Sequence, residues 1–433
     1  SEMCIRDSLN TPRTENGQRG IFVRLFSCKS CAQTLFFENI SCERCAHQLG
    51  FDSESLTLLT LEQDGDALRP LGGQTRYRYC DNAQHGACNW LVQANAQDGL
   101  CAACQHNRTI PDLSVPENLA EWQKMEVAKH RLFYTLMRLG LPHQSIAENP
   151  QTGLAFDFLA DPPSGPRILT GHDEGLITIN LKEADDAMRE RFRTEMGEPY
   201  RTLLGHFRHE VGHYYWNLLV RDAGRRNECR AVFGDDSIDY GQALQAHYEQ
   251  GAPANWAQSY ISAYATMHPW EDFAETWAHY LHIVDTLETA SAFGLRIHPR
   301  RTENELLHAD IDFDPHRAES VEQLIEAWLP LTFAMNSLNR SMGQQDLYPF
   351  VISETVIRKL GFIHELVHGS VGGSATAAGP MPAGIVLPQT PPGRDQPPPD
   401  GDEPPPVDEP PADAPPMPPP HVPVTPPLNV GMV

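Results

Sequence analysis

The sequence predicts an α+β fold in which a few short strands precede several long helices, between a small cysteine-rich module and a proline-rich tail. Three observations support this prediction. Eight of the ten cysteines lie between Cys28 and Cys104, long amphipathic patterns occupy residues 119–368, and 21 of the 37 prolines lie between Pro380 and Pro427. The three regions therefore differ in what could order them: metal ligands, a hydrophobic core, or neither.

These differences divide the chain into five segments. The first residues are polar and lack the apolar stretch of a signal peptide, and the tail lacks the apolar residues needed to offset the entropy of an ordered chain. A polar, proline-punctuated stretch separates the module from the main domain. We expect a non-native or disordered leader at 1–21, the module at 22–108, a linker at 109–118, the main domain at 119–368 and a disordered tail at 369–433.

The charge and composition disfavour two classes of function. The formal net charge is −24 at pH 7, and no basic patch is present that would neutralise nucleic-acid phosphates. No run of about 18 apolar residues exists that could cross a membrane. With no secretion signal either, we expect a cytoplasmic protein that binds neither nucleic acid nor membrane.

The cysteine spacing predicts two structural zinc sites in the module. A Cys-x-x-Cys pair turns two thiolates toward one ion, and four thiolates complete a tetrahedral zinc site. Without a secretion signal, metal sites are favoured over disulfides. The predicted sets are Cys28, Cys31, Cys42 and Cys45 for the first zinc ion and Cys80, Cys88, Cys101 and Cys104 for the second. In the looser second set, His85 and His106 are alternative donors, and free or redox-active thiols are the competing interpretation.

The main domain has the order of strands first and helices second. Apolar residues at helical spacing predict helices at 121–140, 199–221, 269–283, 321–339 and 354–367. Short alternating segments predict strands at 154–159, 167–170 and 176–181. The turn-rich stretch 171–175 is expected to join the last two strands as a hairpin.

The strongest chemical signal is the sequence His209-Glu210-Val211-Gly212-His213 on the second of these helices. Residues four apart lie on one helical face, so both imidazoles can bind one zinc ion. Glu210 then lies beside the metal-bound water and can take its proton. His206 shares this face, but a fourth protein ligand would close the open position that catalysis needs, so we expect it to pack within the helix.

A second match to the same pattern runs from His364 to His368. It is followed by Gly369 and the tail, which offer no ordered third ligand. We expect this copy to be coincidental, with histidines near a helix C-terminus where the dipole favours cations.

The third ligand of the first copy is predicted on the next helix. Trp216 and Leu219 stand where a metzincin needs Gly and His, which leaves a distant glutamate and hence a gluzincin. Glu271 follows Pro269 in the first helical turn, and Glu275 lies one turn further on the same face. By composition either could be the ligand; we assign Glu271 to zinc and Glu275 to the outer N–H of a ligand histidine.

An electrophile for the oxyanion is expected near this helix. Tyr264 is the first choice, and Tyr260 and His268 are the alternatives. His279 and His282, which follow the third ligand, are expected to be structural or to lie around the ligands, and not to bind the metal themselves. Cys229 stands alone in the sequence and is expected to have no special role.

These motifs resemble a bacterial family of zinc-binding metallopeptidases that carries an N-terminal zinc ribbon. The resemblance lies in LGHFRHEVGHYYW (204–216), HPWEDFAETWAHY (268–280), WLPLT (328–332) and NSLNRSM (336–342). It covers residues 22–368 and implies a zincin fold and peptidase chemistry. The third-ligand segment is also similar to that of gluzincins of the Mlc titration factor type, in which a Pro-x-Glu supplies the ligand and a tyrosine seven residues earlier lies at the active site. That similarity favours Glu271 and Tyr264.

Together these features predict a zinc peptidase with one catalytic and two structural zinc ions. Its substrate would be a peptide or protein, held in extended form by an edge strand at 175–181. The zinc ribbons or the proline-rich tail are candidate docking sites for a protein partner. The alternative is a non-enzymatic zinc scaffold, which would have no need of Glu210.

Overall fold

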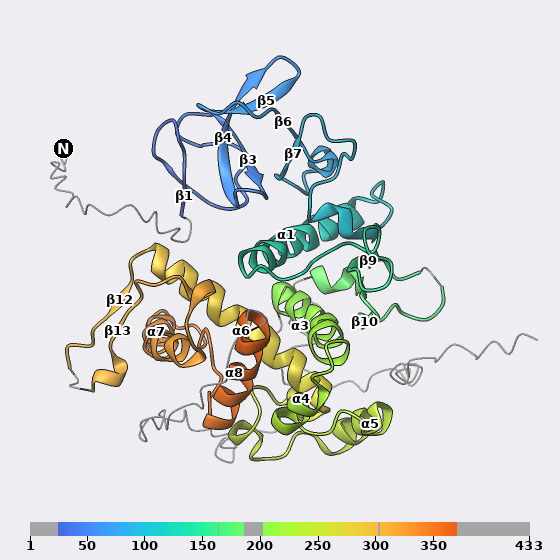
Figure 1. The fold of residues 1–433 in the computed structure, drawn as a ribbon, viewed down its shortest axis with the longest axis vertical. Helices are drawn as coiled ribbons and strands as arrows, with labels where there is room; N and C mark the ends of the chain where they lie inside the picture. Colours follow the sequence, from blue (N-terminus) through green and yellow to red (C-terminus); the bar gives the residue numbers. More distant parts are fainter. Residues whose placement is uncertain (1–24, 163, 186–201, 302–303, 370–433) are drawn as a thin grey trace, which may run out of the picture.

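The computed structural model describes residues 25–162, 164–185, 202–301 and 304–369. The expected leader and all but the first residue of the expected tail lie outside these ranges. Within them, a small β-rich unit lies above a helical body, and helix α1 runs between the two (Figure 1). The α+β class predicted from the sequence is confirmed.

The cysteine-rich unit is built from antiparallel strands. A two-stranded ribbon carries the first Cys-x-x-Cys turn, and a five-stranded meander in the order β3-β4-β5-β6-β7 follows it. The strands are β1 (Phe26–Ser27), β2 (Thr34–Leu35), β3 (Gln48–Asp52), β4 (Thr57–Asp64), β5 (Ala67–Pro70), β6 (Tyr77–Tyr79) and β7 (Leu91–Gln93).

A second, mixed sheet belongs to the helical body. Its order is β10-β11-β9-β8, from β8 (Asn107–Thr109), β9 (Ala155–Leu159), β10 (Gly171–Asp173) and β11 (Leu176–Asn180). β8, β9 and β11 are parallel, whereas β10 and β11 form the predicted antiparallel hairpin.

Two details of this hairpin differ from the prediction. Its first strand lies at Gly171–Asp173, within the segment expected to be the turn, and not at 167–170. The reversal needs only Glu174 and Gly175, both with positive φ. The expected edge strand at 175–181 is also wrong, because β11 lies between β10 and β9 and the sheet edge is β10.

The helices follow the predicted order with shifted ends. α1 begins at Pro116, inside the stretch expected to be linker, because proline suits the first helical turn. Pro199 lies outside the described residues, and the described helix begins at Leu203 behind an N-cap by Thr202. Short helices α4 and α5 were not predicted. The helices are α1 (Pro116–Arg138), α3 (Leu203–Trp216), α4 (Arg226–Phe233), α5 (Tyr240–Gln250), α6 (Pro269–Ala292), α7 (Val321–Ser341) and α8 (Glu354–His368), with a π-helical turn η4 (Asn217–Arg221) after α3.

The remaining elements are short and join the helices. They are the 3₁₀ turns η1 (Asp81–His85), η2 (Cys104–His106), η3 (Leu181–Ala184), η5 (Trp256–Gln258), η6 (Tyr264–Thr266), η7 (Glu305–Leu307) and η8 (Pro315–Arg317), and the hairpin strands β12 (Arg296–Ile297) and β13 (Ala309–Asp310).

The packing of α3 on α6 forms the centre of the body. A Cβ added at Gly212 of α3 would lie 3.0 Å from Ala274 Cα and 3.2 Å from Trp277 Cβ, both on α6. The two backbones can therefore approach this closely only because position 212 has no side chain. Tyr215 stacks on Trp277 next to this contact, with ring centroids 4.7 Å apart.

Helix α1 connects the two units. Toward the cysteine-rich unit, Arg131 pairs with Glu38 and Tyr134 packs edge-on against Phe37. Most buried apolar residues of both units form one continuous cluster, and a second, small cluster in the cysteine-rich unit consists of Leu61, Leu68, Tyr77 and Leu91. The position of α1 is therefore set by contacts with both units.

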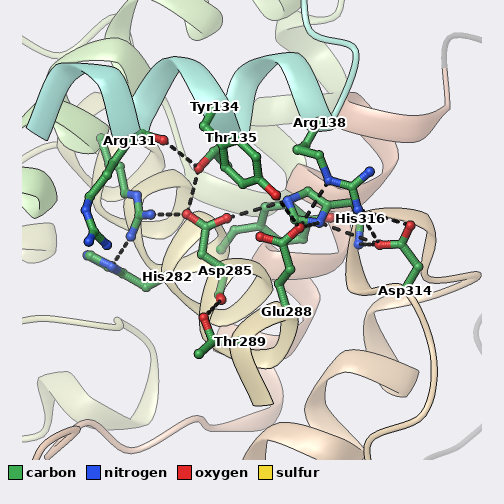
Figure 2. Close-up of polar contacts among 12 residues, drawn as sticks. Arg131, Tyr134, Thr135, Arg138, His282, Asp285, Glu288, Thr289, Asp314 and His316 are labelled. Carbon is green, nitrogen blue, oxygen red and sulfur yellow. Dashed lines mark hydrogen bonds and ion pairs between the residues drawn. The ribbon is translucent and has the colours of Figure 1, made fainter. Parts of the chain in front are cut away.

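On its other side α1 joins a buried ion network with α3, α6 and η8 (Figure 2). Its buried and partly buried charged members are three carboxylates and three cationic groups: Asp285, Glu288, Asp314, Arg138, Arg208 and His316. The exposed Arg317 lies at its rim, 3.9 Å from Asp314. His316 Nδ1 lies 3.3 Å from Glu288 Oε1, and its Nε2 lies 3.5 Å from Asp285 Oδ1. Because two guanidinium groups already contact these carboxylates, the cluster is an ion-pair network that is neutral when His316 is protonated.

This charge balance predicts a pH-dependent stability. Burial alone would lower the pKa of His316, but its contacts with Asp285 and Asp314 and the charge of Glu288 outweigh burial and raise it to about 9. The folded pKa exceeds the unfolded one, so the stabilisation is complete below about pH 6.5 and is lost as the pH rises through 9. The full effect is roughly 3 kcal/mol.

We expect His316→Gln to flatten this dependence. Chemical unfolding of wild type should show the free energy of unfolding falling between pH 7 and pH 9.5 by more than that of His316→Gln. Parallel curves for the two proteins would contradict a protonated His316.

Candidate metal centre

Helix α3 places two imidazoles on one face. The Thr202 side chain accepts a hydrogen bond from the backbone N–H of Gly205 and starts the helix. His209 and His213 follow one turn apart, are both buried, and have ring centroids 4.9 Å apart. Trp270 packs on the His213 ring at 3.8 Å between centroids, which limits its rotation.

Helix α6 brings a carboxylate to both imidazoles. Glu271 Oε2 lies 3.0 Å from His209 Nε2, and Glu271 Oε1 lies 3.5 Å from His213 Nε2. Zinc–ligand bonds of about 2.0–2.2 Å place neighbouring N and O ligands of a tetrahedral site about 3.4 Å apart. The three side chains therefore have the separation that one zinc ion requires, and they form one of the groups able to hold a metal.

Glu275 occupies the position behind the first imidazole. Its Oε1 lies 2.7 Å from His209 Nδ1, and its Oε2 accepts a hydrogen bond from Ser262 Oγ at 2.5 Å. Burial would raise the pKa of Glu275, but the His209 contact and Ser262 outweigh it and lower the pKa to about 2. A carboxylate here orients His209 with Nε2 toward Glu271.

Asp272, which lies between Glu271 and Glu275 in the sequence, has a different partner. Asp272 Oδ2 accepts from Lys359 Nζ of α8 at 2.6 Å, and the same ammonium donates to the backbone oxygen of Ser259. Asp272 is thus paired with α8. This pair holds the C-terminal helix against α6.

Glu210 lies beside His209 and His213 but contacts neither ring at ligand distance. Its Oε1 lies 3.2 Å from His206 Nε2, and His206 Nδ1 lies 3.5 Å from Glu183 Oε2. Burial would raise the pKa of Glu210, but His206 and the charges of the neighbouring histidines lower it. His206, expected to be a packing residue, is thus the contact of Glu210.

Two tyrosines lie at the centre. Tyr264, predicted from the sequence, has its ring centroid 6.0 Å from that of His209. Tyr240 of α5 was missed, and its hydroxyl donates to Glu271 Oε1 at 2.9 Å. It lies 31 residues before its partner, in a helix with no sequence motif. Only the fold relates the two.

The other residues considered from the sequence, three histidines and a tyrosine, have partners outside the three predicted zinc ligands. His268 caps α6 by accepting from the Trp270 N–H, and Tyr260 lies under Lys359. His279 Nδ1 lies 2.7 Å from the Tyr348 hydroxyl, and His282 contacts Arg208.

The second HExxH copy contacts a tyrosine and no third ligand. His364 Nδ1 and His368 Nε2 lie 2.9 and 3.2 Å from the hydroxyl of Tyr280. In the described part of the chain, no group able to hold a metal includes either histidine.

The eight clustered cysteines form two groups of four. In the first, Cys28 and Cys45 sulfurs are 3.4 Å apart and Cys31 and Cys42 sulfurs 3.6 Å apart. A tetrahedral zinc site with bonds of about 2.3 Å requires about 3.8 Å. In the second group, the Cys88 and Cys101 sulfurs are 3.7 Å apart, so both groups fit zinc.

Neither of the alternative donors suggested by the sequence belongs to the second group of four. His106 Nε2 lies 2.7 Å from the His143 carbonyl oxygen, and the His85 ring packs near Trp122. The histidine that reaches the sulfurs is instead His130 of α1. Cys229 is buried on α4 and belongs to neither cysteine group.

Both units of the chain match known protein families. The profile of a family described as "Putative zinc-binding metallo-peptidase" matches residues 118–366, and that of a zinc-ribbon domain matches residues 25–115. Uncharacterized proteins of Mycobacterium bovis and Mycobacterium tuberculosis are each 41% identical over 346 residues, which is 80% of this chain and 95% of theirs. No solved structure matches the chain. No helix among the described residues is long and apolar enough to cross a membrane.

The geometry separates the expected effects of two substitutions on α6. Glu271→Gln replaces an anionic ligand by a weak neutral one, so the affinity of the centre for zinc should fall by more than about 100-fold. Glu275→Gln keeps all three ligand atoms, so zinc should remain bound with roughly 10–100-fold lower affinity. Competition with a chromophoric chelator measures both. Tighter zinc binding by Glu271→Gln than by Glu275→Gln would reverse the assignment.

Proposed function

Because the chain belongs to the family of putative zinc-binding metallo-peptidases, we propose that it is a zinc-dependent peptidase of the gluzincin type. The supporting observation is the combination of three buried donors at zinc spacing, two imidazoles and one carboxylate, with a second carboxylate, Glu210, that faces the same centre without occupying a ligand position. A purely structural zinc site would have no use for that carboxylate.

His209, His213 and Glu271 would hold the catalytic zinc ion. When bound there, zinc supplies a water of lowered pKa and polarises the scissile carbonyl. Three protein ligands leave one position open, as a catalytic zinc site requires. Tyr240 supports Glu271, and Glu275 supports His209.

Glu210 is proposed as the general base. It would take the proton of the attacking water and later give it to the leaving amine. His206 fixes the orientation of the Glu210 carboxylate, and Glu183 faces the other nitrogen of the His206 ring. Tyr264, which lies on the His209 side of the centre, is proposed to donate to the oxyanion on the tetrahedral intermediate.

The substrate would be a peptide in extended form. Edge strand β10 (Gly171–Asp173) contacts helix α3, and the His172 ring lies 6.2 Å from that of His213 between centroids. The unpaired side of an edge strand can hold an extended chain by backbone hydrogen bonds. This assigns to β10 the role that the sequence suggested for 175–181.

The two cysteine groups are proposed to hold structural zinc, giving three ions per chain with the catalytic one. The many uncrosslinked cysteines fit a reducing compartment, so we propose a cytoplasmic location. The zinc ribbons or the proline-rich tail remain proposed contacts for a protein partner.

The proposed role of Glu210 is tested by Glu210→Gln. A general base contributes about 10²–10⁴-fold to the rate, so cleavage of a peptide library, followed by mass spectrometry, should fall by at least about 100-fold while zinc content stays unchanged. The matched control is Glu365→Gln, the same change at the same place in the second HExxH copy, which should cleave like wild type. Unchanged cleavage by Glu210→Gln would contradict its role as general base, whereas no cleavage by wild-type protein loaded with zinc would favour the scaffold alternative.

A further inference from the structure

The second cysteine group has a fifth donor from the other unit of the chain. His130 lies on helix α1, and its Nε2 is 3.2 Å from Cys88 Sγ, 3.6 Å from Cys104 Sγ and 3.8 Å from Cys101 Sγ. Its side chain is only 4% exposed. One imidazole nitrogen therefore sits over three of the four sulfurs.

These separations are those of a second tetrahedral set. With zinc–sulfur bonds of about 2.3 Å and zinc–nitrogen bonds of about 2.0–2.1 Å, an N–S edge is about 3.6 Å. The Cys88–Cys101 edge is 3.7 Å. Cys88, Cys101 and Cys104 thus form a face shared by two donor sets, one completed by Cys80 and the other by His130.

The other ring nitrogen of His130 is held as metal-binding histidines usually are. Nδ1 lies 2.6 Å from the backbone oxygen of Glu126. A carbonyl oxygen can only accept, so Nδ1 is the donor in this contact and Nε2 is the nitrogen that faces the sulfurs. The Glu126 carboxylate is itself held by Lys129 at 2.8 Å and Asn107 at 3.0 Å, which fixes this turn of α1.

The site is not sealed on this side. A cavity of about 430 Å³ between the cysteine-rich unit and α1 is lined by Cys88 and His130, together with Phe37, Tyr79 and Val127. Small shifts of the imidazole or of Cys88 meet free space there.

We propose that the second cysteine site is a five-donor zinc site in which His130 is a ligand alternative to Cys80. This inference rests on the proposed zinc loading of the cysteine groups. Zinc there is held by both units: thiolates from the cysteine-rich unit and an imidazole from the helix that packs on α3, which carries His209 and His213. Zinc occupancy of the second cysteine group and the position of helix α3 are thereby linked.

Three variants of the full chain test this proposal by zinc content per chain: His130→Ala, Cys80→Ala and the double variant. Each single variant retains four donors and should keep as much zinc as wild type, whereas the double variant should lose one ion. Cys28→Ala in the first group is the matched control and should lose one ion by itself. Loss of one ion from Cys80→Ala alone would overturn the proposal.

Cobalt loading gives a second measurement. In Cys80→Ala the thiolate-to-cobalt charge-transfer absorption should fall by about one-eighth, the share of one of eight thiolates, and loss of about half would contradict the proposal.

Should Cys80→Ala not fold, His130→Ala decides. This variant keeps every thiolate but should release one zinc ion to a chelator faster than wild type, and unchanged release counts against His130 as a donor. Wild type that lacks this zinc ion would instead refute the proposed structural loading, and the inference with it.

Discussion

The close approach of α3 and α6 at Gly212 is the contact on which the candidate metal centre depends. Any side chain at this position would meet the backbone of Ala274, and moving the helices apart would separate donors that must lie about 3–4 Å from each other. The glycine between the two histidines of α3 therefore acts through packing. It sets the distance at which Glu271 and Glu275 of α6 face His209.

Around this contact, buried charges are arranged in pairs on each side of α6. Glu275 turns to His209, Asp272 to Lys359 of α8, and Asp285 to Arg208 of α3. A carboxylate without such a partner would be costly to bury. Helix α6 thus carries, within a few turns, one carboxylate that supports a predicted zinc ligand and two that hold neighbouring helices. The partner of each carboxylate determines which of these roles it has. Breaking one partner would leave an unpaired buried charge.

The sequence was sufficient where function follows from helical spacing. The pair His209 and His213, the carboxylates of α6 and the Cys-x-x-Cys turns all depend on local geometry, and the structure brings each set together as expected. It was insufficient where partners come from distant segments: Tyr240 on Glu271 and His130 on the second cysteine group lie in helices without motifs. Likewise, the edge position of β10 is set by which strand pairs with β9, and a turn-rich sequence does not encode that choice.

The central claim is that one zinc ion lies between α3 and α6, bound by His209, His213 and Glu271. Anomalous diffraction at the zinc edge from crystals of the wild-type chain tests it directly. We predict a peak about 2.0–2.2 Å from the Nε2 atoms of both histidines and from a Glu271 oxygen, with Glu275 on His209 Nδ1 and away from the metal. A peak bound by Glu275, or one at His364 and His368, would contradict it.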